Sequence, residues 1–422
     1  MKSLNHLFDH TKMYGMKHKP LYVLSIMTMF WAIFEGIISY IIPLVIIENG
    51  YSMTLMGLII GSSSVAGAIF DFLICKFFNN TNFRRIFLVM FIVCFLLLLL
   101  TLGAKTISAF LLLTAVWGLA FDLNNFGNFD FVGRFTNKSE HSSSFGVIRV
   151  FQSLGYAFAP LFAGLVIGEI VGFKPILLAG IFLAMAFVFY IVLIKVSKTS
   201  LANQVIDEIE DTKPRNTFFE IKLWIKIGKK MMPVLVLTTF LFIIDALYWE
   251  IGPLLGKNFP SFGQFEGIFV TAYSLPPLIV GWFVGEITKK YGKKNTAYYS
   301  LLLGSLILLF LSFTQNPYLV IFIIFASSFF IDISMPSVNG CYADYISEDS
   351  DVEKEIEGVE DLFTNLGYII GPVLAGICAD LFGTAQTFTI FGFFGVIIAI
   401  ILIISTPKHI NINSEKILEV NN

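Results

Sequence analysis

Long apolar runs separated by short polar segments make up most of the sequence. A helix needs about 20 mostly apolar residues to cross the roughly 30 Å hydrocarbon core of a bilayer. Runs of this kind lie at residues 20–48, 53–78, 84–104, 107–133, 144–168, 174–196, 231–256, 262–288, 295–314, 317–345, 356–381 and 385–406. They do not alternate polar and apolar side chains, as the strands of a membrane β-barrel would. The pattern therefore predicts an all-α membrane protein with twelve transmembrane helices.

The second half of the chain repeats the first. Glu35 in the first predicted span recurs 210 positions later as Asp245, and Pro43 recurs as Pro253. We therefore expect two pseudo-symmetric halves of six helices each. The expected divisions are a tail at 1–19, a first half at 20–196, a linker at 197–230, a second half at 231–406 and a tail at 407–422.

The last part of the linker, residues 218–230, has an amphipathic pattern. Apolar side chains such as Leu223 and Trp224 alternate at helical spacing with lysines such as Lys226 and Lys229. This pattern suits a helix that lies on the inner membrane face. A solvated linker helix fits the same residues equally well.

Basic residues indicate the orientation of the chain, because cytoplasmic loops carry an excess of Lys and Arg. Placing both ends in the cytoplasm leaves only Lys105, Lys174 and Lys257 outside. We therefore expect a multi-pass protein with both termini cytoplasmic. The richness in Lys, Asn, Ile and Phe is typical of an AT-rich bacterial genome, so a bacterial inner (plasma) membrane is the expected location.

The composition agrees with burial in lipid and excludes several classes of function. The chain is 56% hydrophobic and 14% charged, about half the charged fraction of a soluble domain. The net charge of −2 and the lack of a basic, aromatic-rich patch give no indication of nucleic-acid binding. The sequence contains no GxxxxGK[ST], HExxH or GxSxG motif, and the four cysteines lack metal-ligand spacing. We expect no enzyme activity, cofactor or metal.

Two motifs resemble those of the major facilitator superfamily. Residues 285–294 resemble the family's loop between the second and third helices of a half, with Lys289 in the usual place of an acid. Residues 155–164 and 367–376 resemble the family's glycine-proline motif of the fifth helix, with Ala159 in place of a glycine in the first copy. The resemblance implies two six-helix halves around a central cavity lined by helices one, four, seven and ten. It implies gating or packing roles for Arg84, Arg85, Gly155, Pro160, Gly164, Gly285, Lys289, Lys290, Gly292, Lys293, Lys294, Gly367, Gly371, Pro372 and Gly376.

Four acids lie at equivalent depth in the predicted spans. Glu35 pairs with Asp245, and Asp122 pairs with Asp332, since both pairs differ by 210 positions. At 1.5 Å per residue each lies about 21 to 22 Å along its helix. Repeat-built transporters place substrate and coupling-ion sites near the midplane, and a membrane-buried acid is usually functional. We expect these acids to bind a proton or a cationic solute, with structural hydrogen bonding as the alternative.

Other polar groups in the spans could orient a solute or join helices. Each is read either as a ligand or as a contact between helices. They are Tyr40, Asn124, Asn125, Asn128, Gln152, Tyr248, Trp249, Glu250, Asn339 and Tyr342.

Further residues suggest gates and bends. We expect Arg149 to form a salt bridge with Asp130, because an unpaired cation in a span is expensive. Asp71 is read as a packing residue or second proton group, and Asp344 as a gate residue. The Pro276-Pro277 pair should bend the eighth span, because proline removes a backbone donor.

These features predict a secondary active transporter that works by alternating access, moving a small solute as a monomer in the bilayer. Proton-coupled export of amphipathic or cationic compounds is the first hypothesis, since the chain has 46 Phe and many acids in its spans. A proton symporter of sugars or other small metabolites is the second. A receptor or lipid-handling protein that resembles a transporter but no longer cycles is the third.

Overall fold

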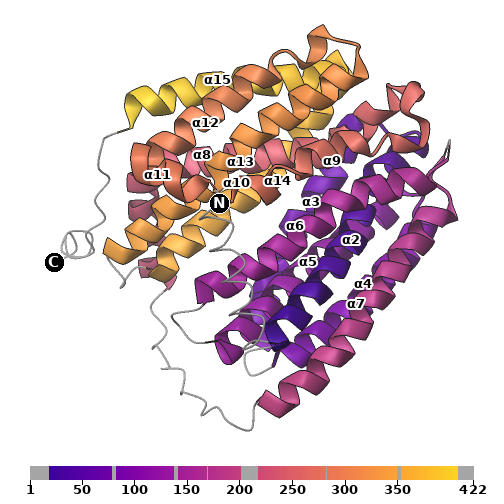
Figure 1. Ribbon diagram of the computed structural model, residues 1–422, viewed down its shortest axis with the longest axis vertical. Helices are drawn as coiled ribbons and strands as arrows, with labels where there is room; N and C mark the ends of the chain where they lie inside the picture. Colours follow the sequence, from indigo (N-terminus) through magenta and orange to yellow (C-terminus); the bar gives the residue numbers. More distant parts are fainter. Residues whose placement is uncertain are drawn as a thin grey trace, which may run out of the picture. The chain divides into compact units, whose positions relative to one another are not determined.

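The computed structural model describes residues 19–77, 82–136, 141–168, 170–200, 217–281, 283–348 and 353–406. The expected tails, nearly all of the linker between 200 and 217, and the side chain of Asp71 lie outside the described part. Within it the chain is helical and contains no strand (Figure 1).

Among the described residues, eleven helices are long and apolar enough to cross a membrane, and there are twelve spans when the bent pair Ile268–Val280 and Val284–Tyr291 is counted as one. Most of the predicted spans agree with helix bounds to within a few residues, because the apolar length of a span is written directly in the sequence. The elements are α2 (Lys19–Glu48), α3 (Met53–Phe77), α4 (Phe83–Gly103), α5 (Ile107–Phe135), α6 (His141–Val166), α7 (Phe173–Ser200), α8 (Thr217–Lys257), η3 (Pro260–Phe265), α9 (Ile268–Ser274), α10 (Pro277–Val280), α11 (Val284–Tyr291), α12 (Lys293–Leu308), η4 (Leu311–Phe313), α13 (Pro317–Glu348), α14 (Glu353–Phe382) and α15 (Thr384–Ser405).

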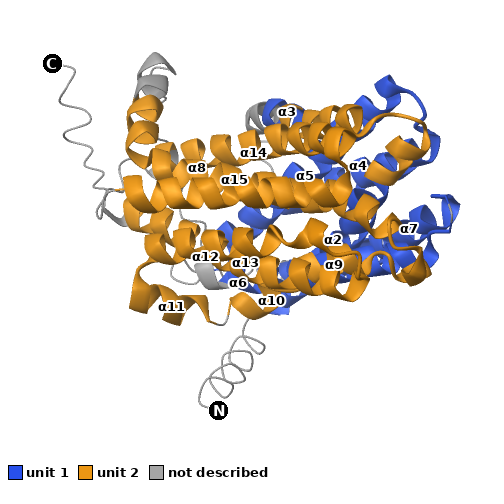
Figure 2. Ribbon diagram, turned by 90° about the horizontal axis from the view of Figure 1, so that it is seen from above, with its two compact units in different colours: residues 1–42, 66–209 blue, residues 43–65, 210–422 orange. Residues whose placement is uncertain are grey.

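The chain divides into two compact units that do not follow the middle of the sequence (Figure 2). Unit 1 consists of Met1–Ile42 and Ala66–Ile209, and unit 2 of Pro43–Val65 and Glu210–Asn422. The end of α2 and the first half of α3 therefore belong with the second half of the chain.

In unit 1, α4 packs against α5 and α7 through aromatic side chains. The Phe83 ring lies edge-on to the Phe131 ring, with 5.3 Å between centroids. Gly155 of α6 permits close packing on α2, since a Cβ there would lie 2.5 Å from the Met29 carbonyl oxygen. The glycine of the fifth-helix motif thus serves helix packing.

In unit 2, α14 packs along α8, and α12 packs against α13 and α15. A Cβ on Gly367 would lie 2.7 Å from the Thr239 carbonyl oxygen, and one on Gly371 would lie 3.0 Å from the Ile243 Cα. The second copy of the glycine motif therefore makes the same kind of contact with α8 as Gly155 makes with α2.

The end of α2 and the start of α3 are fastened to α14 within unit 2. Asp380 accepts hydrogen bonds from the backbone N–H of Met53 (3.0 Å) and of Thr54 (2.7 Å), and from the Thr54 hydroxyl (2.6 Å). Nearby, Lys257 Nζ lies 2.7 Å from Glu48 Oε1. Asp380 thus caps the first turn of α3, where the N–H groups have no partner in their own helix.

Close approach of glycines strengthens this fastening. A Cβ on Gly57 would lie 2.1 Å from the Pro372 carbonyl oxygen, and one on Gly376 would lie 2.1 Å from the Met53 carbonyl oxygen. Since no side chain fits in such a space, the backbones of α3 and α14 touch directly.

Residues 218–230 are helical, as their amphipathic pattern predicts, and their position on the inner membrane face or in solvent stays a prediction. These residues form the first turns of α8, which continues into the span without a break. Leu223 and Ile227 are buried, and the Trp224 ring lies 2.5 Å from where a Cβ on Gly358 of α14 would be. Part of the apolar face therefore packs on a neighbouring helix, α14.

The predicted break at Pro276-Pro277 is present, but the sharp bend lies farther along. α9 ends at Ser274 and α10 begins at Pro277. The 67° bend separates Ile268–Val280 from Val284–Tyr291. The proline pair interrupts the helix, and the chain turns after Val280.

Candidate functional site

Asp245 forms the centre of a polar cluster inside unit 2. The Tyr273 hydroxyl donates to Asp245 Oδ1, and the Tyr368 hydroxyl donates to Asp245 Oδ2 at 2.7 Å. Both carboxylate oxygens are therefore held by tyrosines from other helices, α9 and α14. Two such donors can stabilise a negative charge on this carboxyl group when a cation is bound beside it.

Asp332 of α13 is connected to this cluster through Ser328. The Ser328 hydroxyl lies 2.7 Å from the Tyr273 carbonyl oxygen and 3.1 Å from Asp332 Oδ2. A serine hydroxyl carries one proton. Ser328 can therefore donate to only one of the two oxygens at a time. If it donates to the Tyr273 carbonyl, the contact with Asp332 is also a hydrogen bond when Asp332 is protonated and donates to the Ser328 hydroxyl.

Further aromatic rings pack on the two tyrosines that hold Asp245. The Tyr248 ring stacks on the Tyr273 ring with 4.0 Å between centroids and 13° between planes. The Phe388 ring lies 5.0 Å from that of Tyr248, and the Phe242 ring 5.1 Å from that of Tyr368. A carboxylate beside aromatic faces is a chemistry that binds organic cations.

In unit 1 the equivalent acid, Glu35, has a different partner. It is 5% exposed, and the Trp117 indole N–H donates to its Oε1 at 2.8 Å. Asp122 is half-buried, and its Oδ2 lies 3.0 Å from the position of a Cβ on Gly67. Gly67 therefore leaves the space that Asp122 occupies.

Glu35 and Asp245 lie in different units, so that their facing a common cavity stays a prediction. Within its own unit, each acid accepts a hydrogen bond from an aromatic side chain on another helix.

The other candidate solute ligands differ in exposure. Tyr40, Asn124, Asn128, Tyr248, Glu250 and Tyr342 are buried, Asn125, Gln152 and Trp249 are half-buried, and Asn339 is exposed. Tyr342 shares a hydrogen bond of 2.6 Å with Thr238, and the Thr28 hydroxyl lies 3.5 Å from Asn128 Oδ1. Neither side-chain amide atom of Asn124 has a hydrogen-bond partner among the described residues.

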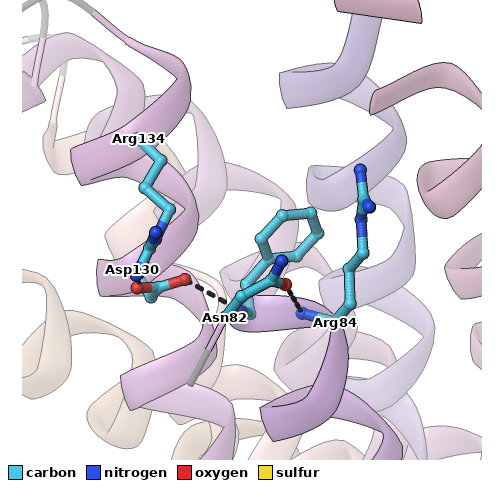
Figure 3. Close-up of polar contacts among 5 residues, drawn as sticks. Asn82, Arg84, Asp130 and Arg134 are labelled. Carbon is cyan, nitrogen blue, oxygen red and sulfur yellow. Dashed lines mark hydrogen bonds and ion pairs between the residues drawn. The ribbon is translucent and has the colours of Figure 1, made fainter. Parts of the chain in front are cut away.

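The predicted salt bridge between Asp130 and Arg149 is wrong (Figure 3). Asp130 Oδ1 accepts from Arg134 Nε at 2.8 Å, and Oδ2 accepts from the Phe83 backbone N–H at 2.6 Å. Arg149 is exposed. Asp130 pairs with Arg134 because Arg134 lies one turn along the same helix, and residues four apart share one helix face.

In the second half, Lys293 stands 210 positions after Phe83 and likewise connects the start of one helix to a neighbouring helix. Lys293, at the start of α12, contacts Asp344 of α13 and donates to the Gly340 carbonyl oxygen at 3.1 Å. Gly292 has φ +81° between α11 and α12, a conformation that side chains rarely adopt. The side chains of Arg85, Lys289 and Lys290 are exposed, and a Cβ on Gly285 would meet nothing within 4 Å.

Sequence reasoning missed the partners of the acids. Trp117 and Tyr273 carried no signal, because a span rich in aromatics gives no reason to single out one ring. Tyr368 follows Gly367 in the glycine-proline motif, and Tyr156 follows Gly155 at the same place in the first copy of that motif, 212 positions earlier, so the repeat could have marked both tyrosines.

Basic residues are missing from the sequence around these acids. Residues 20–75, 231–256, 258–288, 295–353 and 355–407 contain no Lys or Arg. The acids on α2, α8, α13 and α14 consequently have no basic side chain within their own spans. Among the described residues, no group of three or more His, Cys, Asp and Glu could hold a metal ion.

The chain is similar to one family of known proteins in sequence. Residues 24–350 and 234–418 match the sequence model described as "Major Facilitator Superfamily". No curated protein matches the chain.

Solved structures share the fold across most of the chain. The crystal structure of nucleoside transporter NupG has a TM-score of 0.71 at 13% identity and covers 91% of this chain and 98% of its own. A bacterial homolog of the human lysosomal transporter Spinster, inward-facing and unoccupied, has a TM-score of 0.69 at 11% identity. The match covers 91% of this chain and 94% of that structure's chain. The crystal structure of peptide transporter POT in complex with sulfate has a TM-score of 0.67 at 12% identity, and the match covers 91% of this chain and 94% of that structure's chain. Identities this low show the fold of two six-helix halves and leave the solute open.

Proposed function

The chain belongs to the major facilitator superfamily, and from this membership we propose that it is a secondary transporter that exports amphipathic cations in exchange for protons. It is an integral, multi-pass membrane protein of a transporter family. The choice of solute rests above all on Asp245, whose carboxylate accepts two tyrosine hydrogen bonds beside stacked aromatic rings.

The charges of the spans support a positive solute. An acid buried in a span needs a compensating charge or a proton, and the helices that carry Asp245 and Asp332 contain no basic residue in their spans. A cation that stacks on Tyr248 or Tyr368 would supply that charge. A neutral sugar would not supply this compensating positive charge.

Exchange follows if proton and cation compete for the same carboxylates. Asp245 with its tyrosines and Glu35 with Trp117 bind the cation when ionised and lose it when protonated. Because either occupant neutralises the acid, and only the neutralised site can be buried cheaply, the protein cycles with a proton in one direction and a cation in the other.

Purified protein in proteoliposomes tests this proposal with tetraphenylphosphonium, a permanently charged aromatic cation. A pH gradient should drive accumulation of the cation in the compartment with the higher proton concentration, with protons moving the opposite way. Asp245→Asn should abolish binding and flux. Tyr298→Phe is the matched control, because its hydroxyl contacts only Thr406 within the described part of unit 2.

Two other results would replace the proposal. Movement of a neutral solute such as uridine together with protons, with no flux of the cation, would support the symporter of small metabolites. Binding of solutes without flux of any, in protein that is fully folded, would support a receptor that does not cycle.

A further inference from the structure

Glu250 is a buried acid that takes no part in the hydrogen bonds around Asp245. It is 3% exposed, and neither of its carboxyl oxygens has a hydrogen-bond partner in the part of the chain that the structure describes. Among the described residues no charged group acts on it. Its repeat counterpart in the first half, 210 positions earlier, is Tyr40, so the acid is particular to the second half.

The two acids of α8 leave the helix in different directions. Five residues separate Asp245 from Glu250, which corresponds to about 140° around the helix and about 7.5 Å along it. Asp245 meets hydroxyl donors from α9 and α14. Glu250 meets none.

Several titratable groups of the helices packed against α8 have partners other than Glu250. On α9 and α14, Tyr273 and Tyr368 bind Asp245. On α13, Asp332 contacts Ser328, and on α14, Asp380 caps α3. Also on α14, Glu360 and Asp361 accept from Thr364 and Asn365, and α15 has no titratable side chain. None of these groups, and no other charged group among the described residues, acts electrostatically on Glu250.

The energies of the two protonation states differ greatly in such surroundings. Burying an ionised carboxylate without a partner costs at least several kcal/mol, whereas a neutral group without a hydrogen bond costs about 1–3 kcal/mol. The neutral acid is therefore the form that this conformation holds.

The helix beside Glu250 is built to bend. Pro253 cannot donate a backbone hydrogen bond to the Trp249 carbonyl, and its ring clashes with that carbonyl in a regular helix. Gly252 and Gly256 flank it and lack side chains that would stiffen the turn. Cβ atoms there would lie 2.8 Å from a Val270 methyl and 2.8 Å from the Glu266 carbonyl oxygen, so this turn touches η3 and α9 closely.

We propose that Glu250 is a dedicated proton-binding residue, neutral in the present conformation, which releases its proton when the turn around Pro253 bends and admits water. Asp245 then binds the cation, and Glu250 carries a proton through the same cycle. This inference rests on the proposed cation–proton exchange and adds a second, separate proton site to it.

Infrared spectroscopy of the purified protein in detergent tests the protonation state directly. The carbonyl stretch of a protonated carboxylic acid should be present at neutral pH and should lose intensity in Glu250→Gln, which keeps the shape of the neutral acid. Glu286→Gln is the matched control, because Glu286 is exposed on α11 and this change should leave the band of the buried acid unaltered. A spectrum unchanged by Glu250→Gln would overturn the proposal.

The transport assay separates this proposal from the proposed function. Glu250→Gln should bind tetraphenylphosphonium with a dissociation constant within about twofold of the unchanged protein, while accumulation driven by a pH gradient falls at least about tenfold, as for loss of a buried proton site. Full accumulation in Glu250→Gln would overturn the role of Glu250 and leave that of Asp245 intact. Normal cation binding by Asp245→Asn would instead overturn the proposed function, whatever the infrared result for Glu250.

Discussion

Asp245 and Glu250 illustrate how neighbouring acids on one helix receive different environments. Asp245 accepts two hydrogen bonds from tyrosines, which stabilise a negative charge there when a cation is bound. Glu250 receives neither a hydrogen bond nor the influence of a charged group among the described residues. The sequence alone shows two acids five residues apart, and only the packing of α8 assigns a different chemistry to each.

Tyr368→Phe should weaken binding of tetraphenylphosphonium. The change removes the hydroxyl that donates to Asp245 Oδ2, and a hydrogen bond to a charged group is worth about 1.5–3 kcal/mol. The ionised carboxylate then competes less well with the protonated acid for this site. Isothermal titration calorimetry should give a dissociation constant at least about tenfold higher, whereas Tyr298→Phe should leave it unchanged. Equal affinities for Tyr368→Phe and Tyr298→Phe would contradict this role of Tyr368.

Asp130→Ala should destabilise the protein far more than Arg134→Ala. Loss of Asp130 leaves the Phe83 amide without its acceptor, which costs about 1–3 kcal/mol. The Arg134 ion pair is partly exposed and contributes roughly 0.3–0.5 kcal/mol. Arg149→Ala should have no effect, because Arg149 is exposed. Thermal unfolding midpoints in detergent measure the relative stabilities of the three variants. A large decrease in the midpoint of Arg149→Ala would contradict this account and support a salt bridge between Arg149 and Asp130.

Among the helices, the sequence predicts lengths well and neighbours poorly. The bounds of α2, α3 and α4 follow the apolar runs, because lipid demands length and nothing else. The contacts of Trp224 could not be predicted, since an amphipathic pattern identifies an apolar face without identifying what covers it. The same limit applies to Tyr273 and Tyr368, which reach Asp245 from 28 and 123 positions away.

The connection between α3 and α14 gives a testable property of these helices. Any motion that separates the two sequence halves at the start of α3 must break the three hydrogen bonds to Asp380. It must also part the backbones that touch at Gly57 and Gly376.

Asp380→Ala should therefore loosen the first turn of α3. Loss of a capping side chain costs about 0.5–2 kcal/mol, so amide exchange at Met53 and Thr54 should become about 2- to 30-fold faster. Hydrogen–deuterium exchange with mass spectrometry measures this, with Glu286→Ala as the control. Unchanged exchange at these amides would show that the cap does not hold the segment.

For the molecule as a whole, the repeat of the sequence explains both what is shared and what differs. The glycines Gly155 and Gly367 make the same packing contact in both halves. The acids Glu35 and Asp245 recur at the same position, but their partners, an indole and two phenols, do not. Repetition thus maintains the scaffold, while the binding chemistry varies between the halves.

The absence of Lys and Arg from most spans gives the whole protein one charge preference. Cations and protons are the occupants that such spans accept at least cost. This preference connects the proposed solute to the proposed coupling ion, because one carboxylate cannot hold both.

Proton release on cation binding tests this competition most directly. Purified protein in weakly buffered detergent, mixed with tetraphenylphosphonium, should release protons that a pH indicator records, and the double variant Glu35→Gln with Asp245→Asn should release none. Binding by the unchanged protein without proton release, or equal release by the double variant, would contradict the account.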